Sequence, residues 1–517
     1  MNKAPHGHRS DGTGEEEPSR HRPRYPDPEV SPDVTQDAVV IVPGIMGSEL
    51  YDTVEKKVVW GLSNPGWLVN AWTGAHGGLG GLHLTPDERE GRLGRIVARR
   101  LLTAPAWAPV LKGHEPYPDL VATATAAVAD PDAVLPFAYD WRLPVATNAR
   151  LLAAEARRHL TYWRGHEAHA RARRHRVDER EGRLVFVAHS MGGLVTLAAL
   201  TGGYDNDLEA DTRGVMTLGA PFRGAVNAAV ILNSGQGSPV PLPHRRLREL
   251  AVTLPGVHDL LPRFPCLDEG TDVRVPSTAD IVALGGDPYL AEQSRTLHEG
   301  LSGKRLPGHR AVVGINQSTL QSMTLDGGTV TGAEHSFRLH TDGTVLRDRT
   351  TLLPHRFPVG GDGTVHKESA ALGREIVPVS LQHGALAQGS AAMDAVASFL
   401  KEDEHLGPTQ AGGAGLGLLI PDVVTPGSRW EIRVTGVDSP KGITCEVQTV
   451  PAAPTSDGPR PVGPRPIRAR LSGDDHDGLT ARVTLPASGL YRVTVDSGNG
   501  EPLTQLLLAA ESDGKDH

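Results

Sequence analysis

The sequence predicts an α/β protein in which helices cover both faces of a mostly parallel sheet, followed by a small antiparallel β-sandwich. Two patterns lead to this prediction. From residue 37 to about residue 402, short apolar strands alternate with helical stretches, the order that builds a parallel sheet. Beyond residue 418, strands with alternating apolar and polar residues are separated by Pro, Gly, Asp and Ser turns. A chain of 517 residues is long enough for both domains.

The elements of the first domain are predicted from short runs that share one feature, an apolar strand or an amphipathic helix bounded by glycine, proline or charge. In chain order they are the strand DAVVIVPG (37–44), a helix from Asn148 to about Arg174, the strand 184–188 with a helix at 194–200, the strand GVMTLGAP (214–221), the strand REIVPVSL (374–381) and a closing helix SAAMDAVASFL (390–400).

Three segments complete the predicted organisation. Residues 1–36 are polar, charged and rich in proline, which is typical of a disordered tail. Residues 403–418 are glycine-rich and acidic and are predicted to form a linker. Residues 419–510 form the predicted β-sandwich, with strands in RWEIRVTGV, GITCEVQTV, IRARL, LTARVTL and LYRVTV.

Composition excludes several classes of protein. A net charge of −9 and a pI near 6.2 argue against a nucleic-acid-binding protein. The two cysteines, Cys266 and Cys445, lie far apart, so no disulfide framework is expected. There is no apolar run of about 18 residues and no secretory signal pattern at the N-terminus. We therefore expect a cytoplasmic protein, with peripheral membrane contact as an alternative address.

The stretch FVAHSMGGLV (186–195) places Ser190 between a buried apolar strand and a helix. A serine on such a tight turn has an exposed hydroxyl and needs small neighbours, the arrangement called a nucleophile elbow and written G-x-S-x-G. Ala188 occupies the first glycine position, and Gly192 and Gly193 follow the serine. The alternative is an ordinary glycine-containing turn that holds a serine.

A serine nucleophile needs a base, and the base needs a carboxylate to orient it. In α/β-hydrolases these residues follow in the order Ser, acid, His. Asp362 in VGGDGTVHKESA is the candidate acid, although Asp-Gly is also a common turn dipeptide. His383 is the candidate base because it directly follows a strand and precedes the last helix of the domain.

The oxyanion formed by serine attack needs backbone N–H donors. Met191, the residue after the serine, is one candidate. Met46, in the loop PGIMGSEL (43–50) after the first strand, is the other, and an ordinary βα turn is the alternative reading of this loop. Together the four features, in the required order, predict a serine hydrolase.

These motifs resemble those of the lecithin:cholesterol acyltransferase-like α/β-hydrolases, a family that also includes phospholipid:diacylglycerol acyltransferases and lysosomal phospholipases. The resemblance rests on PGIMGSEL, YDWRL (139–143), AHSMGG, LGAPFRGA (218–225), GDGTV and the His-Gly after the last strand, and covers roughly residues 37–402. It implies an α/β-hydrolase fold with a cap or lid inserted around 225–275. It also implies Ser190, Asp362 and His383 as the catalytic triad, with Met46 and Met191 forming the oxyanion hole.

Two further regions fit a lipid substrate. Trp60, Trp67 and Trp72 are three of only seven tryptophans and are candidates for contact with lipid, either at a membrane surface or in an acyl-chain groove. The alternative is that they belong to the core. The amphipathic stretch 245–264 falls in the cap region, or else is a helix packed flat on the body. For Asp140 and Arg142, in YDWRL, we expect a buried ion pair that braces the pocket.

The leading hypothesis is a serine hydrolase of the lipase or phospholipase A type that acts on a lipid or phospholipid through an acyl-enzyme. The first alternative is an O-acyltransferase that passes the acyl group to an alcohol or sterol. A non-catalytic scaffold that binds lipid or partners, and an esterase or thioesterase for small substrates, are the others. No cofactor or metal motif is present, and the β-sandwich gives no sign of which partner it binds.

Overall fold

The computed structural model describes residues 34–61, 75–102, 117–174, 180–205, 207–236, 244–340, 344–372, 376–403, 416–421, 423–437, 439–450, 465–474, 478–498 and 502–510. The predicted tail lies outside these ranges up to residue 33, and the predicted linker does so from residue 404 to residue 415. Thr35 and Gln36, at the end of the predicted tail, are fully buried, and Thr35 N–H donates to Ala127 O at 2.8 Å. The folded domain therefore begins before residue 37.

The core of the first domain is a six-stranded parallel sheet with the order β15-β10-β7-β6-β1-β5. Its strands are β1 (Ala38–Val42), β5 (Val134–Pro136), β6 (Leu184–His189), β7 (Thr212–Leu218), β10 (Arg310–Gly314) and β15 (Ile376–Val379). All residues of β1 and β6 are buried, which is why both strands read as continuous apolar runs. This architecture confirms the predicted fold class.

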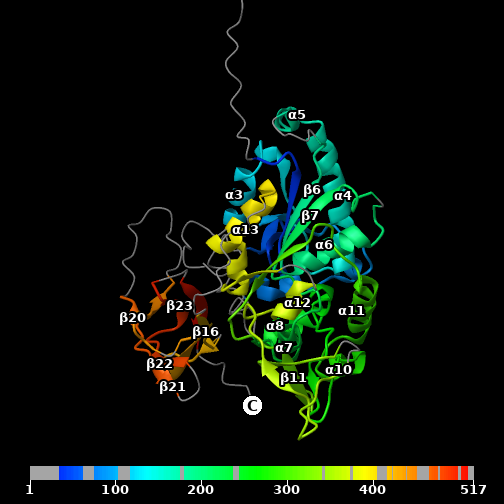
Figure 1. The fold of residues 1–517 in the computed structure, drawn as a ribbon. Helices are drawn as coiled ribbons and strands as arrows, with labels where there is room; N and C mark the ends of the chain where they lie inside the picture. The colour runs from blue at the N-terminus through cyan, green and yellow to red at the C-terminus, as the bar shows by residue number, and fades with distance from the viewer. Residues whose placement is uncertain are drawn as a thin grey trace, which may run out of the picture.

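Helices cover both faces of this sheet (Figure 1). The helices α4 (Val145–Arg164) and α6 (Met191–Thr201) pack together on one face, and α3 (Pro118–Ala126) and α13 (Ser390–Lys401) pack together on the other. The single helix predicted from Asn148 to Arg174 is wrong in one respect. It ends at Arg164, with Gly165 as its C-cap, and a second helix, α5 (Glu167–Arg174), follows, because glycine has a low helix propensity.

Several short elements lie between β1 and β5, the next strand of the parallel sheet along the chain. The strands β2 (Ser48–Asp52), β3 (Lys57–Trp60) and β4 (Ile96–Leu101) form an antiparallel sheet directly after the first loop. Two short helices, η1 (Ala75–Leu82) and α2 (Pro86–Arg89), precede β4. A third, η2 (Pro131–Ala133), directly precedes β5.

Two insertions follow β7. The first contains α7 (Val226–Ser234), α8 (His244–Ala251), α9 (Pro255–His258), β8 (Leu267–Asp268), β9 (Val273–Arg274), α10 (Thr278–Ala283) and α11 (Pro288–Leu301). The second, after β10, contains β11 (Ser322–Asp326), β12 (Thr329–Ala333), β13 (His335–Phe337) and β14 (Arg356–Pro358). The sheet β12-β11-β8-β9 joins both insertions. The chain then returns through α12 (Lys367–Ala371) and, after β15, η3 (His383–Ala387).

The C-terminal domain has its own hydrophobic core between two sheets, β16-β18-β22-β21 and β17-β24-β23-β19-β20. Its strands are β16 (Gly417–Leu419), β17 (Val423–Val424), β18 (Arg429–Thr435), β19 (Thr444–Thr449), β20 (Ile467–Arg468), β21 (Ser472–Asp474), β22 (Gly478–Thr484), β23 (Gly489–Asp496) and β24 (Leu503–Ala509).

Three details of this domain differ from the prediction. The strand β16 begins at Gly417, inside the predicted linker, and Gln317 Nε2 of the first domain donates to Leu416 O at 2.7 Å just before it. The pair β17–β24 is parallel, so the sandwich is not wholly antiparallel. The strand β24 was not predicted, because the apolar run in LTQLLLA hides any alternation.

In the described part of the chain, no helix is both long and apolar enough to cross a membrane.

Candidate functional site

Ser190 lies on the sharp turn between β6 and α6. Its backbone has φ 52° and ψ −128°, a conformation that residues other than glycine rarely adopt and that projects the side chain away from the strand. The helix that follows can approach β1 closely because residue 192 has no side chain. A Cβ on Gly192 would lie only 2.5 Å from the carbonyl oxygens of Val42 and Pro43. The small residues around the serine are therefore required by packing.

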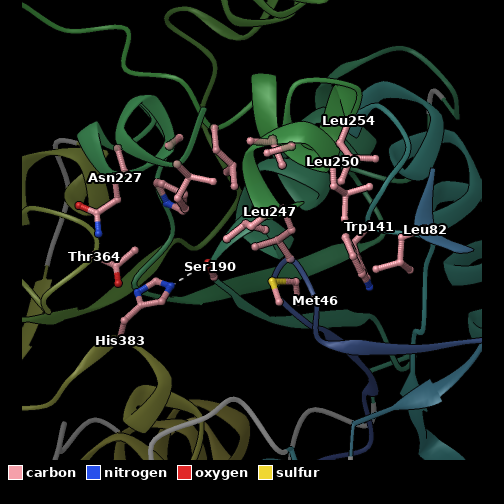
Figure 2. Close-up of a pocket in the computed structure, with 18 of the residues that line it drawn as sticks. Met46, Leu82, Trp141, Ser190, Asn227, Leu247, Leu250, Leu254, Thr364 and His383 are labelled. Carbon is pink, nitrogen blue, oxygen red and sulfur yellow. Dashed lines mark hydrogen bonds between the residues drawn. The ribbon is translucent and has the colours of Figure 1, made fainter. Parts of the chain in front are cut away.

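The structure brings Ser190, His383 and Asp362 together, although the serine and the histidine are 193 residues apart. The His383 Nε2 atom lies 2.8 Å from Ser190 Oγ, and His383 Nδ1 lies 2.7 Å from Asp362 Oδ2 (Figure 2). All three residues are buried. The spacing suits a relay in which Nδ1–H donates to the carboxylate and Nε2 accepts the serine proton.

Backbone groups fix the carboxylate of Asp362. Its Oδ1 atom accepts hydrogen bonds from the N–H groups of Thr364 and Val365, at 2.9 and 2.7 Å, which leaves Oδ2 free to face His383. Asp362 O also accepts from His383 N–H at 2.8 Å. Gly219 lies close to the same carboxylate. Its φ is +60°, and a Cβ at this position would lie 2.8 Å from Asp362 Oδ2. The GAP motif after β7 thus makes room for this pair.

Three buried aromatic side chains hold the loop after β1. Trp60 Nε1 donates to Met46 O at 2.8 Å, Tyr139 Oη donates to Pro43 O at 2.9 Å, and Gly44 N–H donates to Tyr117 Oη at 2.8 Å. Met46 has φ 65° and lines the same pocket as Ser190. Met191 is the first residue of α6, where N–H groups have no acceptor within the helix.

His189, which directly precedes Ser190, connects this loop to the base. Its Nε2 atom lies 3.0 Å from His383 O, and its Nδ1 atom lies 3.0 Å from Tyr117 Oη. Burial and the neighbouring charge of His383 lower the pKa of His189 to about 3, so the ring is neutral. Because a carbonyl oxygen only accepts, Nε2 carries the proton and Nδ1 accepts from Tyr117. One chain of hydrogen bonds therefore runs from Gly44 to His383.

A cavity of about 100 Å³ opens beside Ser190 and His383. Nearly all of its lining is apolar. On the side away from His383 it is formed by Met46, Leu82, Trp141 and the cap residues Leu247, Leu250 and Leu254 (Figure 2). The stretch 245–264 is thus the roof of this cavity, and it is two helices, α8 and α9, with a break before Pro255. An apolar lining of this kind is typical of pockets for apolar ligand groups.

Of the three candidate tryptophans, Trp60 alone lies within the described residues. Trp60 is only 2% exposed, packs edge-on against Trp141 at 5.3 Å between ring centroids, and lines the cavity. It therefore cannot anchor the protein at a membrane surface as it stands. Trp60 belongs to the hydrophobic core, the alternative expected from the sequence, and it also lines the cavity. Trp67 and Trp72 lie outside the described residues.

The Asp-x-Arg step braces the cavity, as expected from the sequence. Arg142 is fully buried and its guanidinium donates to both oxygens of Asp140, at 2.9 and 2.7 Å, and to Glu88 Oε1 at 2.8 Å. Burial alone would raise the pKa of Glu88, but hydrogen bonds from Thr85 and Arg142 and the nearby positive charges outweigh it and lower the pKa.

Another buried carboxylate, that of Asp259, ties the cap to the sheet domain. Asp259, at the end of α9, accepts from Val145 N–H at 2.8 Å and is 4% exposed. Burial raises the pKa of Asp259 to about 7, against opposing contributions from that hydrogen bond and from Arg263. Unlike Arg142 and its partners, this group is not neutralised by a direct ion pair among the described residues.

The contribution of Asp259 to the free energy of unfolding is expected to fall as the pH rises from about 4 to about 7. Over this range the folded state binds more protons at Asp259 than the unfolded state does, because the folded pKa is the higher one. The variant Asp259→Asn should remove this slope and be more stable than the wild type at pH 8. Chemical denaturation of the wild type and of Asp259→Asn at pH 5 and pH 8 measures both effects. If the stability difference between the two proteins is the same at both pH values, the raised pKa of Asp259 is contradicted.

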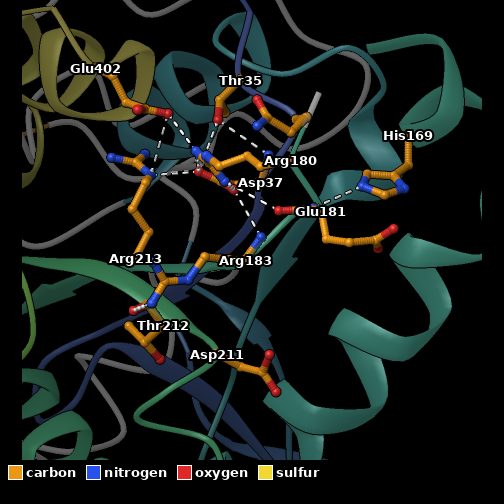
Figure 3. Close-up of polar contacts among 12 residues, drawn as sticks. Thr35, Asp37, His169, Arg180, Glu181, Arg183, Asp211, Thr212, Arg213 and Glu402 are labelled. Carbon is orange, nitrogen blue, oxygen red and sulfur yellow. Dashed lines mark hydrogen bonds and ion pairs between the residues drawn. The ribbon is translucent and has the colours of Figure 1, made fainter. Parts of the chain in front are cut away.

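A cluster of charges around Asp37 lies at the end of the parallel strands opposite to Ser190 (Figure 3). Asp37 is fully buried before β1, and its carboxylate accepts from Arg180 and from Arg213 at the start of β7. Arg180 also contacts Glu402, just after α13. Because each of these charges has an opposite partner, we regard the cluster as structural. Among the described residues, no group of three or more His, Cys, Asp or Glu side chains is arranged to hold a metal.

Sequence reasoning missed four residues at the site: Tyr117, His189, Asn227 and Thr364. The last two line the cavity. A histidine next to the candidate serine was a usable signal for His189, because a polar side chain at the end of a buried strand needs a partner. Tyr117 and Asn227 carry no such signal, since they reach the site only through the fold.

The comparison with protein families agrees with the predicted resemblance. Residues 111–280 match the family model described as lecithin:cholesterol acyltransferase. This match confirms the resemblance over a segment that contains YDWRL, Ser190 and the GAP motif, whereas Asp362 and His383 lie beyond it. It supports an enzyme that acts on acyl esters. No curated protein matches the chain.

Several solved structures are similar to the chain at low identity. A chain of the Tle4–Tli4 complex is 16% identical, with 72% of this chain and 99% of that chain covered and a TM-score of 0.41. The Bacillus licheniformis lipase BlEst2 in its mature form is 13% identical, with 57% of this chain and 69% of the lipase chain covered and a TM-score of 0.26. Its propeptide form is 12% identical, covering 94% of each chain, with a TM-score of 0.32.

Proposed function

We propose that this protein is a serine hydrolase that cleaves acyl esters of lipids through an acyl-enzyme on Ser190. The observation that carries the proposal is the 2.8 Å contact between His383 Nε2 and Ser190 Oγ, with Asp362 on the other ring nitrogen. The apolar cavity next to Ser190 supports an acyl chain as the bound group. The family match over residues 111–280 supports the same class of substrate.

In the first half of the reaction, Ser190 Oγ attacks the carbonyl carbon of the ester while His383 Nε2 takes the hydroxyl proton. The N–H groups of Met46 and Met191 are proposed to stabilise the negative carbonyl oxygen. The bond between the carbonyl carbon and the alcohol oxygen then breaks, and His383 gives its proton to that oxygen. Asp362 stabilises the imidazolium in between.

In the second half, water attacks the acyl-enzyme and gives its proton to His383. Collapse of the intermediate breaks the bond to Ser190 Oγ, which takes the proton back, and the fatty acid leaves. An alcohol can replace water in this step, and the product is then a new ester. Acyl transfer is the second candidate function, because the matching family model is that of an acyltransferase.

The proposal is tested by labelling the purified protein with a fluorophosphonate probe and by incubating it with acylglycerol and phospholipid vesicles, with and without an added alcohol or sterol. We expect labelling and fatty acid release in the wild type and in Ser302→Ala, an exposed serine outside the cavity, but not in Ser190→Ala. New esters in the presence of alcohol would identify acyl transfer. No labelling and no turnover in the wild type would refute the proposal and favour a lipid- or partner-binding scaffold.

The variant Tyr117→Phe is expected to lower kcat roughly 10–100-fold with a smaller effect on KM, because small displacements of the oxyanion loop weaken transition-state contacts more than substrate binding. Loss of the hydroxyl leaves Gly44 N–H without its acceptor and His189 Nδ1 without its donor. The matched control is Tyr162→Phe, which removes the hydroxyl of a half-exposed tyrosine that donates a hydrogen bond to Asp132. Steady-state kinetics and the rate of probe labelling measure the effect. An unchanged labelling rate in Tyr117→Phe would show that the loop does not depend on this contact.

A further inference from the structure

The cavity beside Ser190 is divided by polarity. Apart from the indole N–H groups of Trp60 and Trp141, four of its described lining residues carry a polar side chain: Ser190, His383, Asn227 and Thr364. Figure 2 shows Asn227 and Thr364 on the His383 side of Ser190, whereas Trp141 and Leu82 lie on the opposite side. The apolar side suits an alkyl chain, and the polar pair marks a second region with a different ligand.

Asn227, on α7, brings a side-chain amide to this region, and Figure 2 shows the amide nitrogen on the side of Thr364. Its side-chain carbonyl oxygen is buried and has no hydrogen-bond partner among the described residues. A buried polar atom without a partner destabilises a folded protein, so it is usually satisfied by water or by a ligand. A side-chain amide both accepts and donates, which matches a hydroxyl group.

Thr364 brings a hydroxyl to the same region from the turn that holds the candidate acid. Its backbone N–H donates to Asp362 Oδ1 at 2.9 Å, so its position is fixed by the same hydrogen bonds that orient the carboxylate. Thr364 follows the second insertion, and Asn227 lies on α7 of the cap. Figure 2 nevertheless shows both on the same side of the cavity.

The chemistry of the proposed reaction identifies what this wall contacts. His383 Nε2 is the atom that protonates the leaving oxygen, so the alcohol part of the ester must lie beside His383. Groups on the His383 side therefore meet the alcohol, and those on the far side meet the acyl chain. No Arg or Lys is present among the described lining residues, so a phosphate placed here would lack a counter-charge.

We propose that Asn227 and Thr364 form a subsite for the alcohol part of the substrate, and that this alcohol is an uncharged polyol of the glycerol type with a free hydroxyl beside the esterified one. The inference rests on the proposed function. The same subsite serves a free glycerol-type alcohol that attacks the acyl-enzyme. In that step the alcohol gives its proton to His383, and the new ester bond replaces the bond to Ser190.

The test compares three substrates that share one acyl chain: the 1-acylglycerol, the propyl ester, which lacks the two free hydroxyls, and the 1-acyl-glycerophosphocholine. We expect kcat/KM to be highest for the acylglycerol. Asn227→Leu and Thr364→Val should each lower the ratio of the acylglycerol rate to the propyl ester rate by about tenfold or more. Ser234→Ala, on the same helix as Asn227 but outside the cavity lining, is the matched control and should keep the ratio.

The ratio of the acylglycerol rate to the propyl ester rate distinguishes a failure of the proposed function from a failure of the subsite. If the wild type cleaves none of the esters and is not labelled by the fluorophosphonate, the proposed function fails. If it cleaves the propyl ester and the acylglycerol equally well, or prefers the phosphocholine ester, the subsite is wrong while the hydrolase stands. Equal losses on both neutral esters in Asn227→Leu and Thr364→Val would also overturn the subsite. Asn227→Leu removes a buried unpartnered atom and is expected to fold, which thermal unfolding checks.

A second measurement uses the acyl-enzyme directly. With equal concentrations of glycerol and propan-1-ol, the wild type should form more acylglycerol than propyl ester, and Thr364→Val should bring the two products closer to equal. A product ratio near one in the wild type would contradict the subsite, since both alcohols then compete without recognition.

Discussion

Replacing Asp362 with asparagine is expected to lower kcat by about 10,000-fold, as loss of the orienting carboxylate does in serine proteases. The local geometry dictates how the amide will lie. Two backbone N–H groups, those of Thr364 and Val365, point at the Oδ1 position and will hold the amide oxygen there. The NH₂ group then occupies the Oδ2 position, 2.7 Å from His383 Nδ1.

An NH₂ group in that place donates to Nδ1 and moves the ring proton to Nε2. The Nε2 atom then cannot accept the proton of Ser190, so the base is lost while the fold is kept. Asp348→Asn is the matched control, because Asp348 Oδ1 also accepts two backbone N–H groups, from Thr350 and Thr351, at an exposed site. Single-turnover acylation rates measure the effect. Activity within tenfold of the wild type in Asp362→Asn would mean that this carboxylate does not orient His383.

The largest effect on stability is expected for Arg142→Met, a loss of about 3–5 kcal/mol in the free energy of unfolding. The change leaves the carboxylates of Asp140 and Glu88 buried, at 9% and 4% exposure, without the guanidinium that binds both. Since Leu82 O accepts from the same guanidinium and Leu82 lines the cavity, activity should fall as well.

Two comparisons identify the cause of that loss. Arg295→Met removes an arginine that also bridges two carboxylates, Glu292 and Glu299, but at the surface, and should leave stability nearly unchanged. Combining Arg142→Met with Asp140→Asn and Glu88→Gln removes the stranded charges and should recover part of the loss. Denaturant titration measures all three variants. A loss below about 1 kcal/mol for Arg142→Met would show that water reaches these carboxylates.

The sequence was informative where the local pattern and the tertiary environment agree. The strands β1 and β6 are apolar throughout because both faces of the sheet are covered, and this made them recognisable. The three candidate catalytic residues were found for a related reason. Each lies in a short motif with glycine neighbours, and packing at Gly192 and Gly219 shows why those neighbours must be small.

The parts that were not predicted depend on contacts between distant segments. The sheet β12-β11-β8-β9 pairs strands from two insertions, and β8 and β9 have only two residues each, too few for a periodic signal. Tyr117 reaches Gly44 and His189 across 73 and 72 residues of sequence. Asn227 is one of three polar residues in the otherwise apolar helix α7, and only the position of that helix beside Ser190 gives it a role.

The charge cluster around Asp37 also bears on when the protein can become active during its synthesis. Asp37 stands just before the strand β1, but its partners include Arg180, Arg213 and, through Arg180, Glu402. The strand β15 and His383 lie just before that last residue. A chain emerging from the ribosome therefore cannot close the sheet, or bring a base to Ser190, until nearly 400 residues have been made. The proposed hydrolase would thus stay inert as a nascent chain until the whole first domain has been released.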